Sequence, residues 1–394
     1  MSTTVTTSSQ VAPEYEYFFR DGTMNNRRKI LRGEEAVETF DEIPLVDVGR
    51  IFSDKYEERL LAAKEIADVC KTVGFMYIKN HGIPQELIDK VFELSRQYHA
   101  QPLAVKKEQD VYKSPTLRGY EIHYTKTPDG EAVKKGSFLY SYEPENDPQP
   151  PSLTPEQRDQ CIGIHNQWPA QLPEFKTTLL QYQAALISLA RALLRTFALG
   201  LGADENYFDW IVTAPFVSII LQYYPPRAPG STDLDGLGAH SDFETFTILN
   251  QDMVGGLEIL NKNGIYVPAQ PIRGTFVVNV GDFLQRISND TFVSTVHRVR
   301  NASGVERYSI PFFFSFNMDA SVPVMPACTS ESNPAKYEPR NLHEYTTLRR
   351  KRQREQHEKG IHDTLDVATW ADSRSSWFNG SPGLTSCARP DPED

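Results

Sequence analysis

The sequence predicts an α+β protein that is mainly β, and three observations lead to this prediction. Apolar residues recur at helical spacing in the first half of the chain, most strongly over 172–201. From Phe216 to Phe316 the chain changes to short apolar runs separated by Gly, Pro, Asn and Asp, which is typical of a β-sandwich or jelly roll. Helices come first and strands later, without the alternation of a doubly wound sheet, and no glycine-rich phosphate-binding motif occurs.

The first half of the chain combines short predicted strands with helices. In order, these are a strand over 43–48, a helix over 60–70, a strand over 75–78, a helix opened by Pro84 and the long helix over 172–201. Gly74 ends the first helix, and Gly200 and Gly202 end the long one, because glycine readily adopts the backbone conformation that closes a helix. The segment 104–160 is rich in Gly and Pro, so we expect loops there.

The second half is expected to contain short strands followed by one helix. The strands cover 217–224, 245–249, 256–260, 275–280, 292–300 and 308–316. A helix rich in Arg, Lys and Glu is expected over 338–360. We therefore divide the chain into an arm (1–40), a mixed helical region (41–210), a β core (211–335) and a C-terminal helix with a polar tail (336–394). The arm is Ser/Thr-rich and then charged, which predicts a mobile or loosely docked segment.

The composition of the chain argues against nucleic acids and membranes as binding partners. The 394 residues carry a formal net charge of −11, which argues against a nucleic-acid partner because phosphate backbones require clustered Lys and Arg. The one basic run, 349–354, is followed closely by Glu355 and Glu358 and indicates a solvated helix face. The four cysteines form no CxxC pair, and the chain shows no secretory signal and no apolar run long enough to span a membrane. We expect a reduced, soluble, cytoplasmic protein.

His240 and Asp242 form a His-x-Asp pair in a segment expected to be extended. Side chains two positions apart in a strand point to the same face, so an imidazole and a carboxylate would lie side by side. His297, in another predicted strand, is the candidate third ligand. Two His and one carboxylate form the facial triad of iron(II) oxygenases, which leaves adjacent metal positions open. The same ligand types hold zinc in some hydrolases, so these three residues alone leave both metals possible.

Arg307 and Ser309 follow His297 at the start of the last apolar run. By strand alternation they share one face, where a guanidinium and a hydroxyl could bind a carboxylate. An Arg directed into an apolar run needs an anionic partner, which an internal salt bridge would also provide.

Together, His240, Asp242, His297, Arg307 and Ser309 resemble the pattern of the 2-oxoglutarate- and Fe(II)-dependent dioxygenases. The similarity is to the branch that includes isopenicillin N synthase and plant flavonoid and hormone oxygenases, and it covers roughly residues 41–350. Further similar stretches are Ile43-Pro-Leu-Val-Asp47, Gly74-Phe-Met-Tyr-Ile-Lys-Asn-His-Gly-Ile83, Gln222-Tyr-Tyr-Pro-Pro226 and Gly281-Asp282.

The resemblance implies a double-stranded β-helix, or jelly-roll, core with flanking N-terminal helices and a C-terminal helix. It implies that Fe(II) is bound by the two histidines and Asp242, and that 2-oxoglutarate chelates the iron while its distal carboxylate pairs with Arg307 and Ser309. Tyr224, with Gln222, would contact the C1 end of 2-oxoglutarate. With O2 as the oxidant, succinate and CO2 would be released while a substrate is hydroxylated, desaturated or cyclised.

Candidate substrate residues lie near these motifs or in the loop-rich segment that covers the substrate in the family. Tyr120 belongs to that segment, and Phe243 follows Asp242. Phe313 and Ser315 share the face of Arg307 by alternation, whereas Phe312, Phe314 and Phe316 lie on the opposite face unless a bulge intervenes. The resemblance favours a small molecule, particularly one of fungal specialised metabolism.

Two other functions stay open at this point. One is an iron oxidase similar to isopenicillin N synthase, which uses no 2-oxoglutarate and in which Arg307 and Ser309 hold the substrate carboxylate. The other is a module that binds a metal without catalysis. The identity of the substrate and the oligomeric state are not readable from the sequence.

Overall fold

The computed structural model describes residues 14–20, 23–127, 130–155, 158, 165–227, 235–301, 303–343, 346–347, 351, 354–355 and 358. The strands are β1 (Tyr15–Arg20), β2 (Thr23–Lys29), β3 (Leu45–Asp47), β4 (Phe75–Lys79), β5 (Gly119–Thr127), β6 (Gly130–Ser141), β7 (Pro215–Tyr224), β8 (Asp235–His240), β9 (Phe246–Gln251), β10 (Leu257–Leu260), β11 (Tyr266–Pro268), β12 (Phe276–Val280), β13 (His297–Arg300), β14 (Arg307–Asn317), β15 (Ser321–Val322) and β16 (Arg340–Asn341). The α-helices are α1 (Tyr56–Thr72), α2 (Gln85–His99), α3 (Leu103–Lys106), α5 (Pro173–Gly200) and α6 (Asp282–Ile287).

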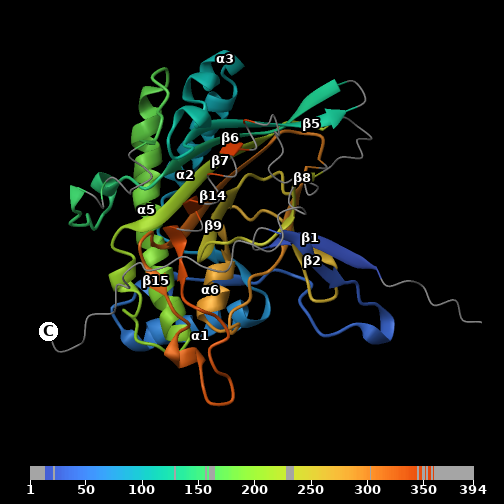
Figure 1. Ribbon diagram of the computed structural model, residues 1–394, viewed down its shortest axis with the longest axis vertical. Coiled ribbons are helices and arrows are strands. Elements are labelled where there is room, and N and C mark those ends of the chain that lie inside the picture. Colours follow the sequence, from blue (N-terminus) through green and yellow to red (C-terminus); the bar gives the residue numbers. More distant parts are fainter. Residues whose placement is uncertain are drawn as a thin grey trace, which may run out of the picture.

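Two large sheets form the core of the molecule. An 8-stranded sheet has the order β3-β4-β12-β9-β14-β7-β6-β5, and a 6-stranded sheet has the order β11-β10-β13-β8-β1-β2. Strands distant in sequence are neighbours, as β9 between β12 and β14 illustrates, which is the pattern of a jelly roll. Figure 1 shows α5 and α2 on one side of the large sheet and β8 with β1 on the other. The predicted jelly-roll core with flanking N-terminal helices is confirmed.

Successive side chains of β14 point alternately to the helix-facing side of the large sheet and to its inner side. Phe312, Phe314 and Phe316 are buried in one apolar cluster with residues of α1, α2 and α5. Arg307 and Ser309 therefore point to the inner side, toward the smaller sheet, as strand alternation predicts. The long α5 matches the helix expected over 172–201 almost residue for residue, because its apolar stripe is continuous.

The segment 104–160, expected to consist of loops, contains the hairpin β5–β6 instead. β6 pairs with β7, so this hairpin extends the large sheet. The prediction is wrong here because one face of the hairpin is polar. Buried Tyr120 and Phe138 pack toward the helices, while Glu121 and Ser137 on the alternate positions break the apolar run that marks a strand.

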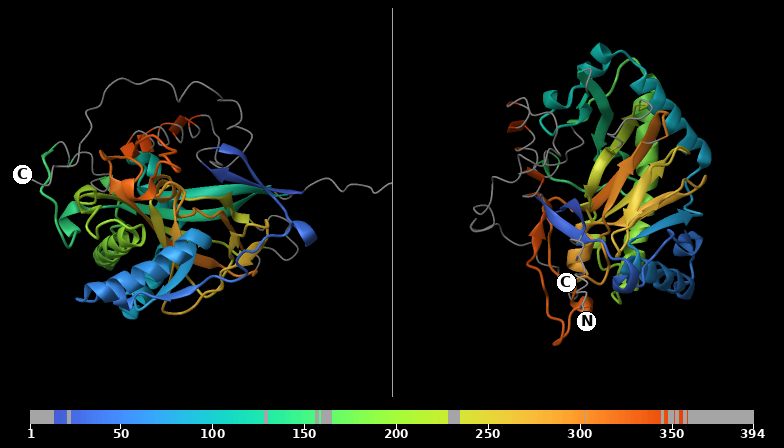
Figure 2. Two further views of the ribbon diagram at one scale, coloured as in Figure 1. Left: turned by 90° about the horizontal axis from the view of Figure 1, so that it is seen from below. Right: turned by 90° about the vertical axis from the view of Figure 1, so that its right-hand side faces the viewer.

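The N-terminal arm is also more ordered than the sequence predicts. Within 1–40, β1 and β2 form an antiparallel hairpin, and β1 joins the smaller sheet beside β8. Figure 2 shows this hairpin against the edge of the core. The charged residues that predicted a loose arm include ones that bind core groups, such as Arg28, which donates to the carbonyl of Leu260.

Two further expectations differ from the structure or lie beyond it. The strand expected over 292–300 is shorter, because only β13 (His297–Arg300) pairs with neighbours. The helix expected over 338–360 starts later than predicted, because β16 (Arg340–Asn341) occupies its first part, whereas the residues described between 342 and 358 are helical. The tail after 363 lies outside the described residues and stays a prediction, as does the four-part division of the chain. No helix in the described part is long and apolar enough to span a membrane.

Candidate metal centre

His240 and His297 face each other across two neighbouring strands. His240 is the last residue of β8, His297 is the first of β13, and the antiparallel register pairs them directly. Their ring centroids lie 4.3 Å apart. The Nε2 atoms of His240 and His297 lie 3.6 Å and 3.7 Å from Oδ1 of Asp242. One ligand atom from each residue therefore points to a common centre, with all three within 4.8 Å of one another.

Asp242 reaches this centre from a different position than the sequence predicts. β8 ends at His240, so Asp242 lies in the following irregular segment and not on the same strand face. The backbone N–H of Asp282, at the start of α6, donates to the carbonyl of Asp242 at 2.7 Å. Gly281 makes this approach possible, because a Cβ atom there would lie 2.0 Å from the carbonyl oxygen of Glu244. Contacts with α6, and not strand alternation, thus place the carboxylate.

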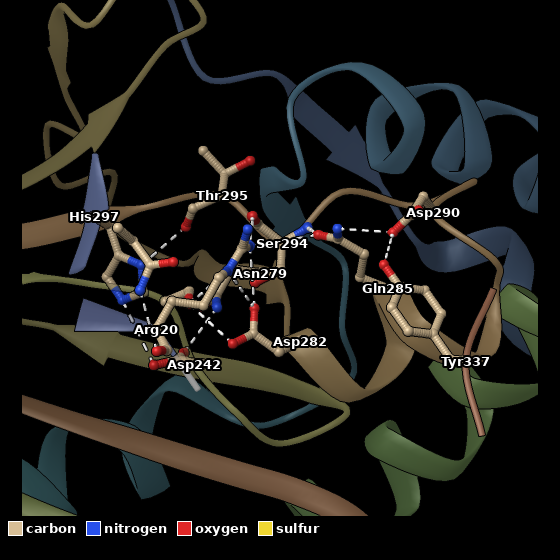
Figure 3. A network of polar contacts seen from close by, with 12 residues as sticks. Arg20, Asp242, Asn279, Asp282, Gln285, Asp290, Ser294, Thr295, His297 and Tyr337 are labelled. Atoms are coloured by element: carbon tan, nitrogen blue, oxygen red, sulfur yellow. Dashed lines mark hydrogen bonds and ion pairs between the residues drawn. The ribbon is translucent and has the colours of Figure 1, made fainter. Parts of the chain in front are cut away.

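The second oxygen of Asp242 is fixed by two buried side chains. The Thr247 hydroxyl donates to Oδ2 at 2.6 Å, and the Asn279 amide donates to the same atom at 2.8 Å. Figure 3 shows Asp242 between Asn279 and His297. Because Oδ2 is held in this way, Oδ1 is the oxygen that faces the two imidazoles. Such partners orient a metal ligand and raise metal affinity.

The protonation of Asp242 and His297 suits metal binding at neutral pH. Burial opposes ionisation of Asp242, but His297, His240 and Thr247 outweigh it and hold the pKa of this carboxyl well below its usual value. Burial, reinforced by nearby His240, lowers the pKa of His297 to about 4. The Nδ1 atoms of His240 and His297 lie 2.8 Å and 3.2 Å from the carbonyls of Gly238 and Thr295. With Nδ1 as the donor, each Nε2 lone pair is free for a metal.

A second polar group lies on the inner side of β14. Arg307 is completely buried, and its Nε donates to the Gly255 carbonyl at 2.5 Å while Nη1 donates to Ser309 Oγ at 3.0 Å. Nη2 is buried and meets no acceptor among the residues that the structure describes. Burial lowers the pKa of Arg307, whereas Tyr224 and Asp252 oppose that shift. A buried guanidinium with an open N–H is a binding site for a carboxylate.

Tyr224 lies beside this guanidinium, and Gln222 lies two residue pairs further along the same two strands. β7 and β14 pair Tyr224 with Arg307 and Gln222 with Ser309. The Arg307 guanidinium carbon lies 5.2 Å from the centre of the Tyr224 ring. Gln222 accepts a hydrogen bond from Ser137 Oγ at 2.6 Å. Tyr224 therefore lies beside the Arg307 guanidinium, and its contact with the C1 end of 2-oxoglutarate stays a prediction.

Of the candidate substrate residues, Phe313 lies beside a residue that holds Asp242. It pairs directly with Thr247 across β14 and β9, and it is only partly buried. Ser315 is fully buried with its hydroxyl 2.9 Å from Thr245 Oγ1. Phe243 is partly buried against Phe216.

Tyr120 is the candidate that the structure does not place on the inner side. Its side chain is buried on the helix-facing side of the large sheet, where its ring centroid lies 6.1 Å from that of Tyr98. Side chains alternate between the two faces along β5. Tyr120 therefore points away from the inner side, which the next residue, Glu121, faces.

Comparisons with known proteins agree with this geometry. Residues 215–316 match the model of the 2OG-Fe(II) oxygenase superfamily, and residues 43–171 match that of the non-haem dioxygenase in morphine synthesis N-terminal family. The chain is 39% identical over 326 residues to the 2-oxoglutarate-Fe(II) type oxidoreductase ppzC of Metarhizium rileyi, covering 79% of this chain and 87% of the relative. The chain belongs to the 2OG-Fe(II) oxygenase superfamily.

Two further matches extend this assignment. The 2-oxoglutarate-Fe(II) type oxidoreductase hxnY of Emericella nidulans is 33% identical over 303 residues, which cover 75% of this chain and 86% of the relative. The solved structure of full-length Neurospora crassa T7H in complex with alpha-KG has a TM-score of 0.67 and 30% identity, covering 78% of this chain and 95% of that chain. This superfamily member is therefore a 2-oxoglutarate- and Fe(II)-dependent oxidoreductase, and the zinc hydrolase reading is excluded.

Sequence reasoning missed Thr247 and Asn279, which orient Asp242. A signal for both was available, because each is a polar residue within a short run that is otherwise apolar, Phe246–Leu249 and Phe276–Val280. A polar side chain at a buried strand position requires a partner, and a metal-bound carboxylate is one such partner.

Proposed function

We propose that this oxygenase oxidises a small organic molecule of specialised metabolism, by hydroxylation, desaturation or ring formation, and releases succinate and CO2. One observation supports the use of 2-oxoglutarate by this chain. Nη2 of buried Arg307 has no hydrogen-bond acceptor among the described residues, so it can bind a carboxylate. Arg307 and Ser309 bind the distal carboxylate of 2-oxoglutarate, and Tyr224 closes that end of the site from the neighbouring strand. Gln222, opposite Ser309, contributes a further polar group.

The histidines and Asp242 hold Fe(II), which supplies the site where 2-oxoglutarate and O2 react. The side chains around the metal orient its ligands and shape the space for the substrate. Thr247 and Asn279 fix the ligating carboxylate. Phe313 and Phe243 offer apolar surface that keeps water from the reacting C–H group. Ser315, whose hydroxyl is engaged with Thr245, shapes the same inner surface.

The substrate class rests on relatives and on the character of this surface. The fungal relatives ppzC and hxnY are named 2-oxoglutarate-Fe(II) type oxidoreductases, and a T7H structure contains thymine, a small planar molecule. The partly buried aromatic side chains of Phe243 and Phe313 suit a compact, largely apolar substrate. A cytoplasmic location and the lack of a nucleic-acid or membrane partner stay predictions from the sequence.

The decisive experiment distinguishes a 2-oxoglutarate-dependent oxygenase from an iron oxidase that does not use 2-oxoglutarate. Apoprotein is titrated anaerobically with Fe(II) and then with 2-oxoglutarate, and the visible absorption of the resulting complex is recorded. A metabolite panel is then screened in air for succinate release coupled one to one with substrate oxidation. Succinate formed in step with product supports the proposal. Product formed without any 2-oxoglutarate would instead establish an oxidase of the isopenicillin N synthase type.

A further inference from the structure

The hairpin β1–β2 touches the metal centre directly. β1 runs parallel to β8, with Phe19 paired to His240. The backbone N–H of Ser241, which lies between the two ligands His240 and Asp242, donates to the Phe19 carbonyl at 3.1 Å. The strand that supplies one ligand is therefore bordered by a segment from the extreme N-terminal part of the described chain.

Arg20, the residue after Phe19, contacts both ligand-bearing segments. Its Nε donates to Ser241 Oγ at 3.1 Å, next to His240 and Asp242. Its Nη2 donates to the carbonyl of Ser294 at 2.6 Å, three residues before His297. Figure 3 shows the Arg20 side chain extending between Asp242 and Ser294. One guanidinium thus joins segments that lie more than fifty residues apart in the sequence.

Two groups on α6 complete this connection. Asp282 accepts from Arg20 Nε at 3.1 Å and, through its other oxygen, from Ser241 Oγ at 2.9 Å. Gln285 Oε1 accepts from the backbone N–H of Ser294 at 2.7 Å and from Arg20 Nη2 at 3.4 Å. Asp282 is almost completely buried, and a buried carboxylate needs a cation held in good geometry.

We propose that Arg20 is a positioning residue of the metal centre, which holds the segment of His240 and Asp242 at a fixed distance from the segment of His297. The planar guanidinium suits this role, because its fork of donors can serve several acceptors at once. Arg20 is not one of the three ligand residues. It acts through Ser241, Asp282 and Ser294, in the way that partners of metal ligands set ligand geometry elsewhere.

The test compares Arg20→Gln with the matched control Arg28→Gln. Arg28 comes from the same hairpin, but its guanidinium donates to the carbonyls of Leu260 and Asn261, both at 2.9 Å. Apoprotein of each variant is titrated with Co(II), whose visible spectrum reports ligand geometry, and with Fe(II) under anaerobic conditions. We expect Arg20→Gln to weaken metal affinity roughly 10- to 100-fold and to alter the Co(II) spectrum, whereas Arg28→Gln keeps both.

Equal metal affinity and equal Co(II) spectra for Arg20→Gln and the wild type would overturn the proposal. A uniform loss in both Arg variants would do so as well, since it would mean that the hairpin only docks. If Arg20→Gln does not fold, Ser241→Ala removes one acceptor of Arg20 without altering the hairpin. We expect a smaller loss of affinity of the same kind from Ser241→Ala, and wild-type affinity there would count against the proposal. These titrations contain neither 2-oxoglutarate nor substrate, so their outcome is independent of the proposed substrate class.

Discussion

His240 and His297 are a directly paired couple on neighbouring antiparallel strands, β8 and β13. The register of two strands, and not a local motif, thus brings the distant histidine to the His-x-Asp segment. Asp242 then approaches both rings through a turn that α6 holds in place. The metal centre is therefore a property of the folded jelly roll, and its affinity depends on residues that never touch the metal.

Replacement of His297 by alanine is expected to abolish turnover. The variant leaves His240 and Asp242 as the only ligands from the chain's triad, and two ligands retain Fe(II) poorly. Bound iron after gel filtration and succinate release should both fall to background, while circular dichroism stays that of the wild type. Turnover near the wild-type rate would contradict the assignment of His297 as a ligand.

Replacement of Arg307 by glutamine is expected to raise the apparent 2-oxoglutarate constant roughly 10- to 100-fold. Hydrogen bonds to charged groups contribute about 1.5–3 kcal/mol each, and the variant loses the charged partner of a carboxylate. Initial rates are measured against 2-oxoglutarate concentration, with Fe(II) affinity as a parallel readout that should stay unchanged.

Arg195→Gln provides a matched control for this measurement. Arg195 forms an exposed ion pair with Asp209 on the far side of the large sheet. Such pairs contribute little, so kinetics should remain those of the wild type. An unaltered 2-oxoglutarate constant in Arg307→Gln would mean that this buried guanidinium has a structural role alone.

The sequence predicts His240, Asp242 and the jelly roll because their signals are local, whereas His297 is distant in the sequence and joins them only through the pairing of β8 with β13. A His-x-Asp pair, an Arg-x-Ser pair and short apolar runs are visible without knowledge of the fold. The hairpin β5–β6 and the docking of β1 are not, because both depend on pairing with distant strands. The sequence also gives no direction for the Tyr120 side chain, since the alternation of a strand applies only once the strand is recognised.

Replacement of Thr247 by valine is expected to weaken Fe(II) binding roughly 10-fold with little change in packing. The substitution keeps the shape of the side chain but removes the hydroxyl that donates to Asp242 Oδ2 at 2.6 Å. Thr245→Val is the matched control, because Thr245 is equally buried and its hydroxyl contacts Ser315 instead. Anaerobic Fe(II) titration of the two apoproteins checks the prediction. Equal affinities in both variants would show that Asn279 alone suffices to orient the carboxylate.

Acid pH is expected to destabilise the fold through His99, which is buried against β7. Burial lowers the pKa of His99 to about 3, a hydrogen bond to the Leu221 carbonyl opposes this shift, and Lys106 adds to it. The unfolded chain protonates this imidazole below about pH 6.5. Between the two values the unfolded state binds more protons, so the free energy of unfolding falls as the pH drops from 6.5 toward 3.

Urea unfolding of the apoprotein at pH 7.5, 6.5 and 5.5 measures this effect. His99 should account for a loss of about 1 kcal/mol between pH 6.5 and 5.5, because one pKa unit corresponds to about 1.4 kcal/mol. In His99→Gln that part of the slope should vanish, even if the variant is less stable at every pH. The same series on His343→Gln, a substitution of an exposed histidine, serves as the matched control for the replacement itself. A slope in His99→Gln as steep as that of the wild type would mean that other buried groups govern the acid response.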